Sequence, residues 1–198
     1  IGDNPESFAK NGNSNYFTDV KGGTVCRIGG DGITPISEYK MHNYFTDLFE
    51  ALDTNTLPYK VFGVYDFRFD EYVIHITNGT IQETIAFSES KNRWVSYYSY
   101  FPDFMVSNKT GLITFNQGQL YRHNTNTLYN NFYGYQYSSQ IKFLSNIEPN
   151  KIKVFTNITE DSTDVWNMVE ATNQYGQRTS LEEEDFEDVE GVYKATLL

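Results

Sequence analysis

Residues 87–102 read FSESKNRWVSYYSYFP and carry the clearest structural signal in the chain. Phe87 and Ser88 end one expected strand, and we expect the polar pair Lys91-Asn92 to form a hairpin tip. From Trp94 to Phe101 every residue is β-branched, aromatic or serine, which is the mix that suits a pleated, half-buried surface. The stretch therefore predicts a β-hairpin whose second strand is rich in aromatic side chains.

Two further strand patterns precede this hairpin and extend it to a four-stranded unit. The four expected strands cover residues 60–66, 71–77, 80–88 and 94–100. Asn78-Gly79 lies between the second and third and is a strong signal for a two-residue turn, because both turn positions need a positive φ. Four antiparallel strands in about 40 residues is the size of one β-propeller blade. Residues 60–100 are therefore the first blade candidate.

Two more sets of short strands follow. The second blade candidate, 112–147, has expected strands at 112–115, 119–123, 131–137 and 139–147. The third candidate, 151–198, is less regular and closes with an expected strand at 191–197. Within the third candidate, Ser180-Leu181-Glu182-Glu183 has the form of a capping box and indicates a short helix.

The chain before residue 60 contains one helical pattern. Residues 1–15 are polar and rich in Gly and Asn, so we expect a loop or tail there. Apolar residues at helical spacing predict one notable helix over about 41–52. We therefore expect a mainly β fold, with β-propeller-like antiparallel blades over residues 16–198. Because the first residue is Ile1 and not Met, we interpret the chain as part of a larger one.

The composition indicates a folded chain and argues against several kinds of binding partner. Aromatic residues make up 17% of the 198 residues, so most of the chain should fold. The net charge of -11 leaves no overall basic footprint for binding nucleic acid. No apolar run approaches the roughly 20 residues of a membrane span. The single cysteine, Cys26, excludes a disulfide within the chain and fits assembly in a reducing cytoplasm.

Few residues form a pattern typical of catalysis or metal binding. His42, His75 and His123 lie far apart, and none has a second His or a Cys at zinc-ligand spacing. Cys26 lies in a strand-like run without a nearby basic cluster, which indicates a buried and inert thiol. We assign no catalytic, cofactor-binding or metal-binding residue, and we expect a protein that is not an enzyme.

Acidic residues gather at two places. Asp66, Asp70 and Glu71 surround Arg68 at an expected hairpin tip, where we expect a solvated, salt-bridged cluster. A calcium loop would need more alternating oxygen ligands and a central glycine. The acidic run over 182–190 is typical of a solvated face, since nothing distinguishes a general acid from a base among so many neighbouring carboxylates.

Tyrosines form the last candidate surface. Tyr129, Tyr133, Tyr135 and Tyr137 lie close together in sequence. In alternating strands such residues mostly fill a core, but tyrosine also anchors protein interfaces and stacks on sugars. This leaves open a second function class, a carbohydrate-binding β-module of an adhesin.

Several blocks in a fixed order resemble one protein family. They are TPIS at 34–37 after an Asp-Gly turn, YDFRFDEY at 65–72, the stretch 87–102, LYRHN at 120–124 and NNFYG at 130–134. In this order they resemble the tail nozzle proteins of short-tailed phages, with the muzzle proteins of crAss-like phages the nearest match. The resemblance covers roughly residues 21–147 and is looser towards the C-terminus.

The resemblance implies a structural virion protein. Proteins of this family form a ring, commonly sixfold, at the distal end of a short tail. The ring lines or closes the DNA exit channel and supports host-adsorption proteins. The implied partners are copies of the same chain, other tail ring or fibre proteins and the remainder of its own longer chain. DNA would be contacted only in transit, and the protein would be assembled in the bacterial host cytoplasm.

Overall fold

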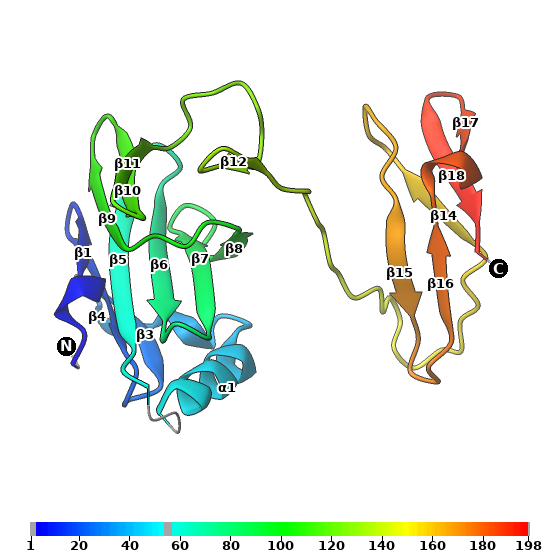
Figure 1. The fold of residues 1–198 in the computed structure, drawn as a ribbon. Coiled ribbons are helices and arrows are strands. Elements are labelled where there is room, and N and C mark those ends of the chain that lie inside the picture. Colours follow the sequence, from blue (N-terminus) through cyan, green and yellow to red (C-terminus); the bar gives the residue numbers. More distant parts are fainter. Residues whose placement is uncertain (1–2, 54–56, 198) are drawn as a thin grey trace. The chain divides into compact units, whose positions relative to one another are not determined.

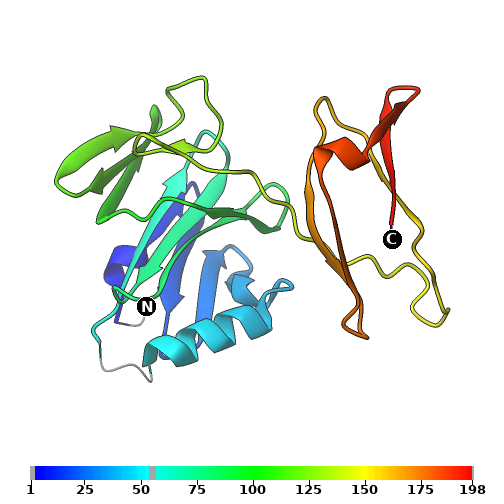
Figure 2. The same cartoon turned by 45° about the vertical axis from the view of Figure 1, so that its right-hand side comes forward.

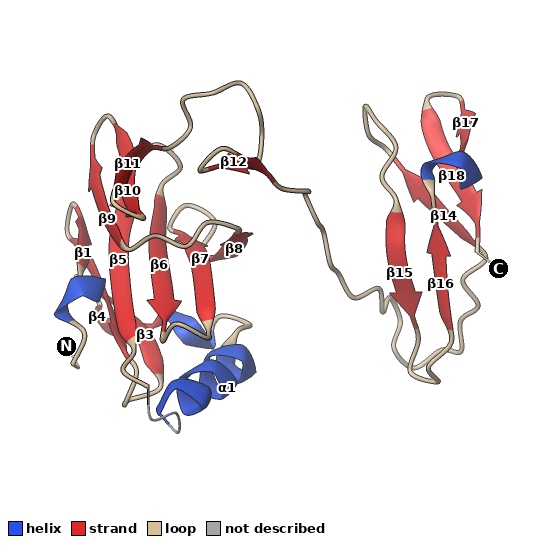
Figure 3. Ribbon diagram, viewed as in Figure 1, coloured by secondary structure: helices blue, strands red, loops and turns tan. Residues whose placement is uncertain are grey.

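The computed structural model describes residues 3–53 and 57–197 and is mainly β (Figures 1 and 3). Its described residues form six antiparallel sheets and one α-helix. The chain divides into two compact units, Ile1–Gln140 and Ile141–Leu198. The expectation of a mainly β fold with one notable helix is confirmed, while closure into a propeller stays a prediction.

The first sheet begins earlier than the sequence indicated. Its elements are the 3₁₀ helix η1 (Pro5–Ser7) and strands β1 (Ala9–Asn11), β2 (Ser14–Asp19), β3 (Thr24–Gly29) and β4 (Gly32–Pro35), in the order β1-β2-β3-β4. The loop expected over residues 1–15 is therefore wrong for the described part of that range. Gly12, at φ +57°, occupies the first central position of the tight turn that joins β1 to β2. The polar composition of residues 1–15 gave no signal for β1, the edge strand of this sheet.

The helix α1 (His42–Asp53) follows a short 3₁₀ turn, η2 (Ile36–Glu38). Phe45, Phe49 and Leu52 are all buried, and their spacing places them on one helix face. This is the face that the apolar spacing predicted, so the helix expected over about 41–52 is confirmed.

The second sheet contains the aromatic hairpin and matches the first blade candidate, 60–100. Its strands are β5 (Lys60–Asp66), β6 (Glu71–Thr77), β7 (Gln82–Ser88) and β8 (Arg93–Tyr98), in the order β5-β6-β7-β8. Side chains on both faces are buried, because odd-numbered residues of β5 face one core and even-numbered ones face another. This sheet is the central layer of its unit.

The turn between β6 and β7 differs from the expectation. The last paired residues are Thr77 and Gln82, so the loop has four residues and not two. The Asn78 carboxamide Oδ1 accepts hydrogen bonds from the backbone N–H groups of Thr80 and Ile81, at 3.0 and 2.7 Å. The side chain thus organises the turn itself, as asparagine does in Asx turns.

The third sheet only partly matches the blade candidate 112–147. Its strands are β9 (Phe104–Asn108), β10 (Gly111–Asn116) and β11 (Gln119–Arg122), in the order β11-β10-β9. The sequence reading missed β9. A short ribbon follows, formed by β12 (Asn131–Phe132) and β13 (Tyr135–Gln136). The strand expected at 139–147 is wrong, because no strand occurs between Gln136 and Asn157 and the backbone there finds no pairing partner.

The three larger sheets of this unit lie in succession (Figure 2). The first strands of the sheets are neighbours: β1 contacts β5, and β5 contacts β9. One core lies between the first sheet, α1 and the second sheet, and the other lies between the second and third sheets. Trp94 on β8 joins α1 to the first core, since its ring centroid is 4.7 Å from that of Phe45.

The unit Ile141–Leu198 is smaller. Its elements are β14 (Asn157–Glu160), β15 (Met168–Thr172), β16 (Arg178–Leu181), the 3₁₀ helix η3 (Glu183–Asp185), β17 (Glu187–Val189) and β18 (Val192–Thr196). They form a sheet of order β14-β18-β17 and the pair β15-β16. Leu181, Phe186 and Ala195 are its buried apolar residues. The closing strand is confirmed, but the blade candidate 151–198 is two small sheets and not one four-stranded unit.

Candidate functional site

The three histidines have separate structural settings. His42 lies exposed on α1 with its Nδ1 2.9 Å from Glu38 Oε1. The Nδ1 of His75 lies 2.9 Å from Thr84 Oγ1, and the Nε2 of His123 lies 2.8 Å from Thr114 Oγ1. Burial lowers the pKa of His75 and of His123 to about 4. Both are neutral at pH 7 and hydrogen-bonded within the fold.

Cys26 and the acidic run over 182–190 lie in settings typical of a buried thiol and of a solvated surface. Cys26 is buried, and its Sγ–H points to Thr24 Oγ1 at 3.5 Å. Glu183, Glu184 and Asp185 form η3 and are exposed, as are the acidic residues that follow Phe186. Within residues 3–53 and 57–197, no group of three or more His, Cys, Asp or Glu is placed to hold a metal ion.

The carboxylates at the β5–β6 hairpin are not the solvated cluster that we expected. Asp66 and Glu71 are cross-strand neighbours and both are buried. The Tyr98 hydroxyl donates to Glu71 Oε2 at 2.9 Å, and burial raises the pKa of Glu71. The guanidinium of Arg68 instead donates to the Asn124 carbonyl at 2.8 Å. The second core extends to the strand ends, so these carboxylates are covered.

A polar network that sequence reasoning missed connects the first two sheets. Glu89, at the β7–β8 tip, accepts hydrogen bonds from the Tyr16 hydroxyl at 2.6 Å and from Arg27 Nη1 at 2.8 Å. Arg27 also pairs with Asp31 at 3.3 Å. Burial and the Glu89 carboxylate raise the pKa of Tyr16. Glu89 lies more than 60 residues from both Tyr16 and Arg27, so no local pattern signals its two contacts.

The tyrosines near the ribbon divide into two groups. The Tyr133 hydroxyl donates to Thr114 Oγ1 at 2.9 Å, and burial raises the pKa of Tyr133 to about 12. Tyr129 and Tyr135 are 89% and 70% exposed, so the expectation of a core role is wrong for them. A short ribbon has no second layer that could cover both of its faces.

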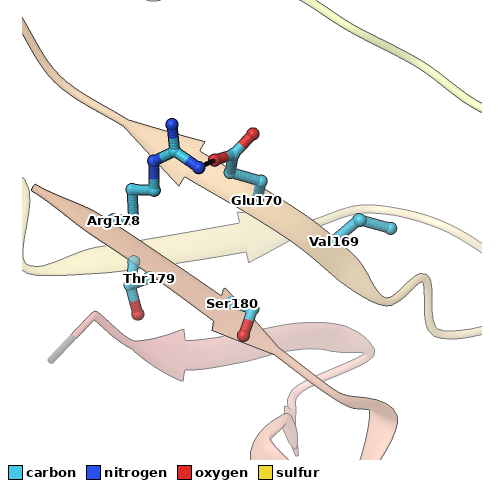
Figure 4. A pocket seen from close by; sticks show the side chains of 5 residues that line it. All are labelled: Val169, Glu170, Arg178, Thr179 and Ser180. Atoms are coloured by element: carbon cyan, nitrogen blue, oxygen red, sulfur yellow. Dashed lines mark ion pairs between the residues drawn. The ribbon is translucent and has the colours of Figure 1, made fainter. Parts of the chain in front are cut away.

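The surface depressions are shallow. One lies over β15 and β16, where Arg178 and Glu170 form an exposed ion pair at 3.1 Å beside Val169 (Figure 4). Another lies where β1, β5 and β9 meet and is lined by residues such as Lys10, Phe67 and Val106. Neither combines buried polar groups in the way that small-molecule sites do. In the described part of the chain, no helix has the length and apolar character to cross a membrane.

Comparison with protein-family models gives two matches. The model of the Crassvirus muzzle protein covers residues 2–118, and the model of the Crassvirus muzzle protein C-terminal domain covers residues 127–198. The chain belongs to the Crassvirus muzzle protein family. No curated protein sequence matches it. The resemblance inferred from the sequence blocks is confirmed.

The gap between the two family matches, residues 119–126, contains β11, so the first match ends one strand before the third sheet does. The three stacked sheets end with β11 at Arg122, between the two matched ranges. The ribbon and the whole unit Ile141–Leu198 lie in the C-terminal match. The muzzle family is a family of phage structural proteins, and membership implies a component of the virion tail.

Proposed function

We propose that the chain is a building block of a ring at the end of a phage tail, around the channel through which DNA leaves. The observation that carries the proposal is the family match along nearly the whole chain, in one consistent order. In this role the protein works by shape and contact, without catalysis, and it is assembled in the host cytoplasm before it joins the tail.

The arrangement of the sheets supports a propeller-like core for such a ring. Propeller blades are antiparallel sheets set around a central channel. Here three successive sheets pack face to face, with their first strands, β1, β5 and β9, as neighbours. We propose that further blades, from this chain or its neighbours, complete the closure. The proposed symmetry is sixfold.

The charge supports a passive role towards DNA. The chain has 26 acidic against 15 basic residues. Phosphates bind Lys and Arg strongly at low salt, whereas a carboxylate-rich wall repels them. A ring of such chains lets the duplex pass without retaining it.

Labelling of intact particles tests the location. An antibody raised against the purified chain should mark the distal end of the tail in electron micrographs of the phage. An antibody against the major capsid protein, which should mark only the head, is the control. Label confined to the head, or absent from washed particles, would overturn the assignment to the tail.

The exposed Tyr129 and Tyr135 favour one alternative, a carbohydrate-binding β-module of an adhesin. Exposed tyrosine rings can stack on sugars. The alternative predicts that the chain alone binds a defined glycan on an array and that Tyr129→Ala abolishes the signal. The ring proposal predicts no glycan binding without partner proteins.

A further inference from the structure

Residues 141–155, here called the central segment, expose many apolar side chains. Phe143 is 75% exposed, Ile147 79%, Ile152 102% and Val154 83%. Between β13 and β14, the structure contains no strand or helix. A monomer rarely leaves so many neighbouring large apolar side chains in water unless they mark an interaction surface.

The central segment already contains a turn. The backbone N–H of Lys151 donates to the Glu148 carbonyl at 3.0 Å across Pro149-Asn150. Two side-chain contacts continue the same register: Lys151 Nζ reaches Glu148 Oε1 at 2.8 Å, and Lys153 Nζ reaches Asn146 Oδ1 at 3.1 Å. The arms before and after the turn therefore face each other as the strands of a hairpin would.

This register gives the segment two different faces. Side chains alternate along an extended arm, and cross-strand neighbours share a face. One face thus carries Asn146, Glu148, Lys151 and Lys153 near the turn, with Leu144 and Phe155 at the far ends of the arms. The other face carries Phe143, Ile147, Ile152 and Val154 and is here called the apolar face.

Proline explains why the arms do not pair fully by themselves. Tight two-residue hairpin turns need a positive φ at the first central position, and Pro149 holds φ near −65°. A turn with that φ splays the strands that it joins. The two arms therefore do not cover the apolar face by themselves.

The third sheet offers an apolar surface that is only partly covered. On β9 to β11, Met105, Leu112 and Thr114 point into the second core and are buried. The alternate residues form the opposite face, here called the open face. It consists of two cross-strand rows, Phe104–Phe115–Leu120 and Val106–Ile113–Arg122. Phe104, Val106 and Leu120 are 43%, 39% and 62% exposed, and the Phe104 ring also contacts the Phe62 ring on β5 at a centroid distance of 5.6 Å.

We propose that the apolar face of the central segment docks on the open face of the third sheet in a second copy of this chain. One chain carries both surfaces at different places, which is the condition for a head-to-tail contact, and such contacts close into rings when the rotation permits. The inference rests on the proposed ring and identifies one contact that holds it together.

Charge also favours a second copy as the occupant. The central segment has three lysines and one glutamate, a net charge of +2, so the rest of the chain carries −13. A basic segment on an otherwise acidic protein is drawn to another copy of that protein. Its lysines lie on the face away from the apolar contact, where they remain in water.

Crosslinking between two differently tagged chains tests the contact. One chain carries Leu120→Cys and the other Val154→Cys, and both are treated with a short bis-maleimide after mixing. The natural Cys26 is buried, so the parent protein serves as the background control. We expect a covalent product that carries both tags. A doubly substituted single chain that reacts only within itself would overturn the proposal, because the segment would then cover its own third sheet.

A matched pair of charge variants separates this contact from the ring itself. Ile152→Asp places a carboxylate on the apolar face, and Asn146→Asp places the same charge on the opposite face. We expect Ile152→Asp to weaken self-association at least tenfold in sedimentation, and Asn146→Asp to leave it within twofold. A ring that persists in Ile152→Asp would refute the docking but not the ring, whereas a parent chain that never self-associates would refute both.

Discussion

Trp94 is half-buried and connects three elements. Its indole Nε1–H donates to the Ile36 carbonyl at 2.9 Å, and its ring lies 4.7 Å from Phe45 and 5.5 Å from Phe87. Truncation of a large aromatic residue in such a site costs about 3–5 kcal/mol. We expect Trp94→Ala to lower the free energy of unfolding by about that amount in a urea titration.

The matched control for this prediction is Trp94→Phe. It keeps much of the ring contact and loses the hydrogen bond, which contributes about 1 kcal/mol. A Trp94→Ala protein as stable as the parent would show that Trp94 does not anchor β8 to α1.

Because His75 is buried, we expect the free energy of unfolding to depend on pH. Burial lowers its pKa to about 4, against about 6.5 in an unfolded chain, so folding requires the neutral ring. The stability that depends on a neutral His75 is therefore fully present above about pH 6.5. It is lost as the pH falls towards 4, and the free energy of unfolding drops by up to about 1.4 kcal/mol per pH unit.

The measurement is the free energy of unfolding at pH 7 and pH 5 for three proteins. We expect His75→Gln to show a smaller loss between the two values than the parent. His42→Gln, which changes an exposed histidine, should behave as the parent does. Equal losses in His75→Gln and the parent would contradict a buried neutral His75.

The packing of η1 on the second sheet depends on one glycine. A Cβ atom at Gly63 would lie 2.1 Å from the Ser7 carbonyl oxygen, to which the Tyr72 hydroxyl donates at 2.7 Å. We expect Gly63→Ala to displace η1 and to destabilise the protein by about 1–3 kcal/mol. Gly30→Ala, where a Cβ meets no atom within 4 Å, is the control for thermal melting. Equal melting temperatures for both variants would contradict the close packing.

The elements with strong local patterns could be predicted from the sequence. The hairpin of β7 and β8 has a polar tip and aromatic strands, and α1 shows Phe45, Phe49 and Leu52 at helical spacing. The sequence does not predict β1 because the strand has three residues and only Ala9 is apolar, although Gly12 before Asn13 is a readable turn signal. The residues over 139–147 predicted a strand, but a strand also needs a partner, and no strand of the described residues pairs with this stretch.

The polar contacts between elements could not be predicted. Glu89 joins Tyr16 and Arg27 across more than 60 residues, and the Arg68 guanidinium donates to the distant Asn124 carbonyl, while only the backbone N–H of Arg68 reaches the neighbouring Asp66 carboxylate. Such contacts depend on how the sheets pack against one another, and local sequence patterns do not reveal this packing. The family, by contrast, could be recognised from sequence motifs in a fixed order along the chain, because comparing that order requires no knowledge of how the elements pack.

The whole chain should have no affinity for free DNA. Its net charge of -11 opposes the counterion release that drives binding to a duplex. We expect no binding of a labelled duplex in a titration at low ionic strength, where any basic patch acts most strongly. Tight binding that disappears as salt rises would contradict a passive channel wall.

Electron microscopy of the purified chain at high concentration tests whether the protein assembles into a ring. We predict closed particles with rotational symmetry, six copies and an open axial channel, and the Ile152→Asp protein should form fewer of them. A chain that stays monomeric at every concentration, or that forms compact particles without a channel, would contradict it.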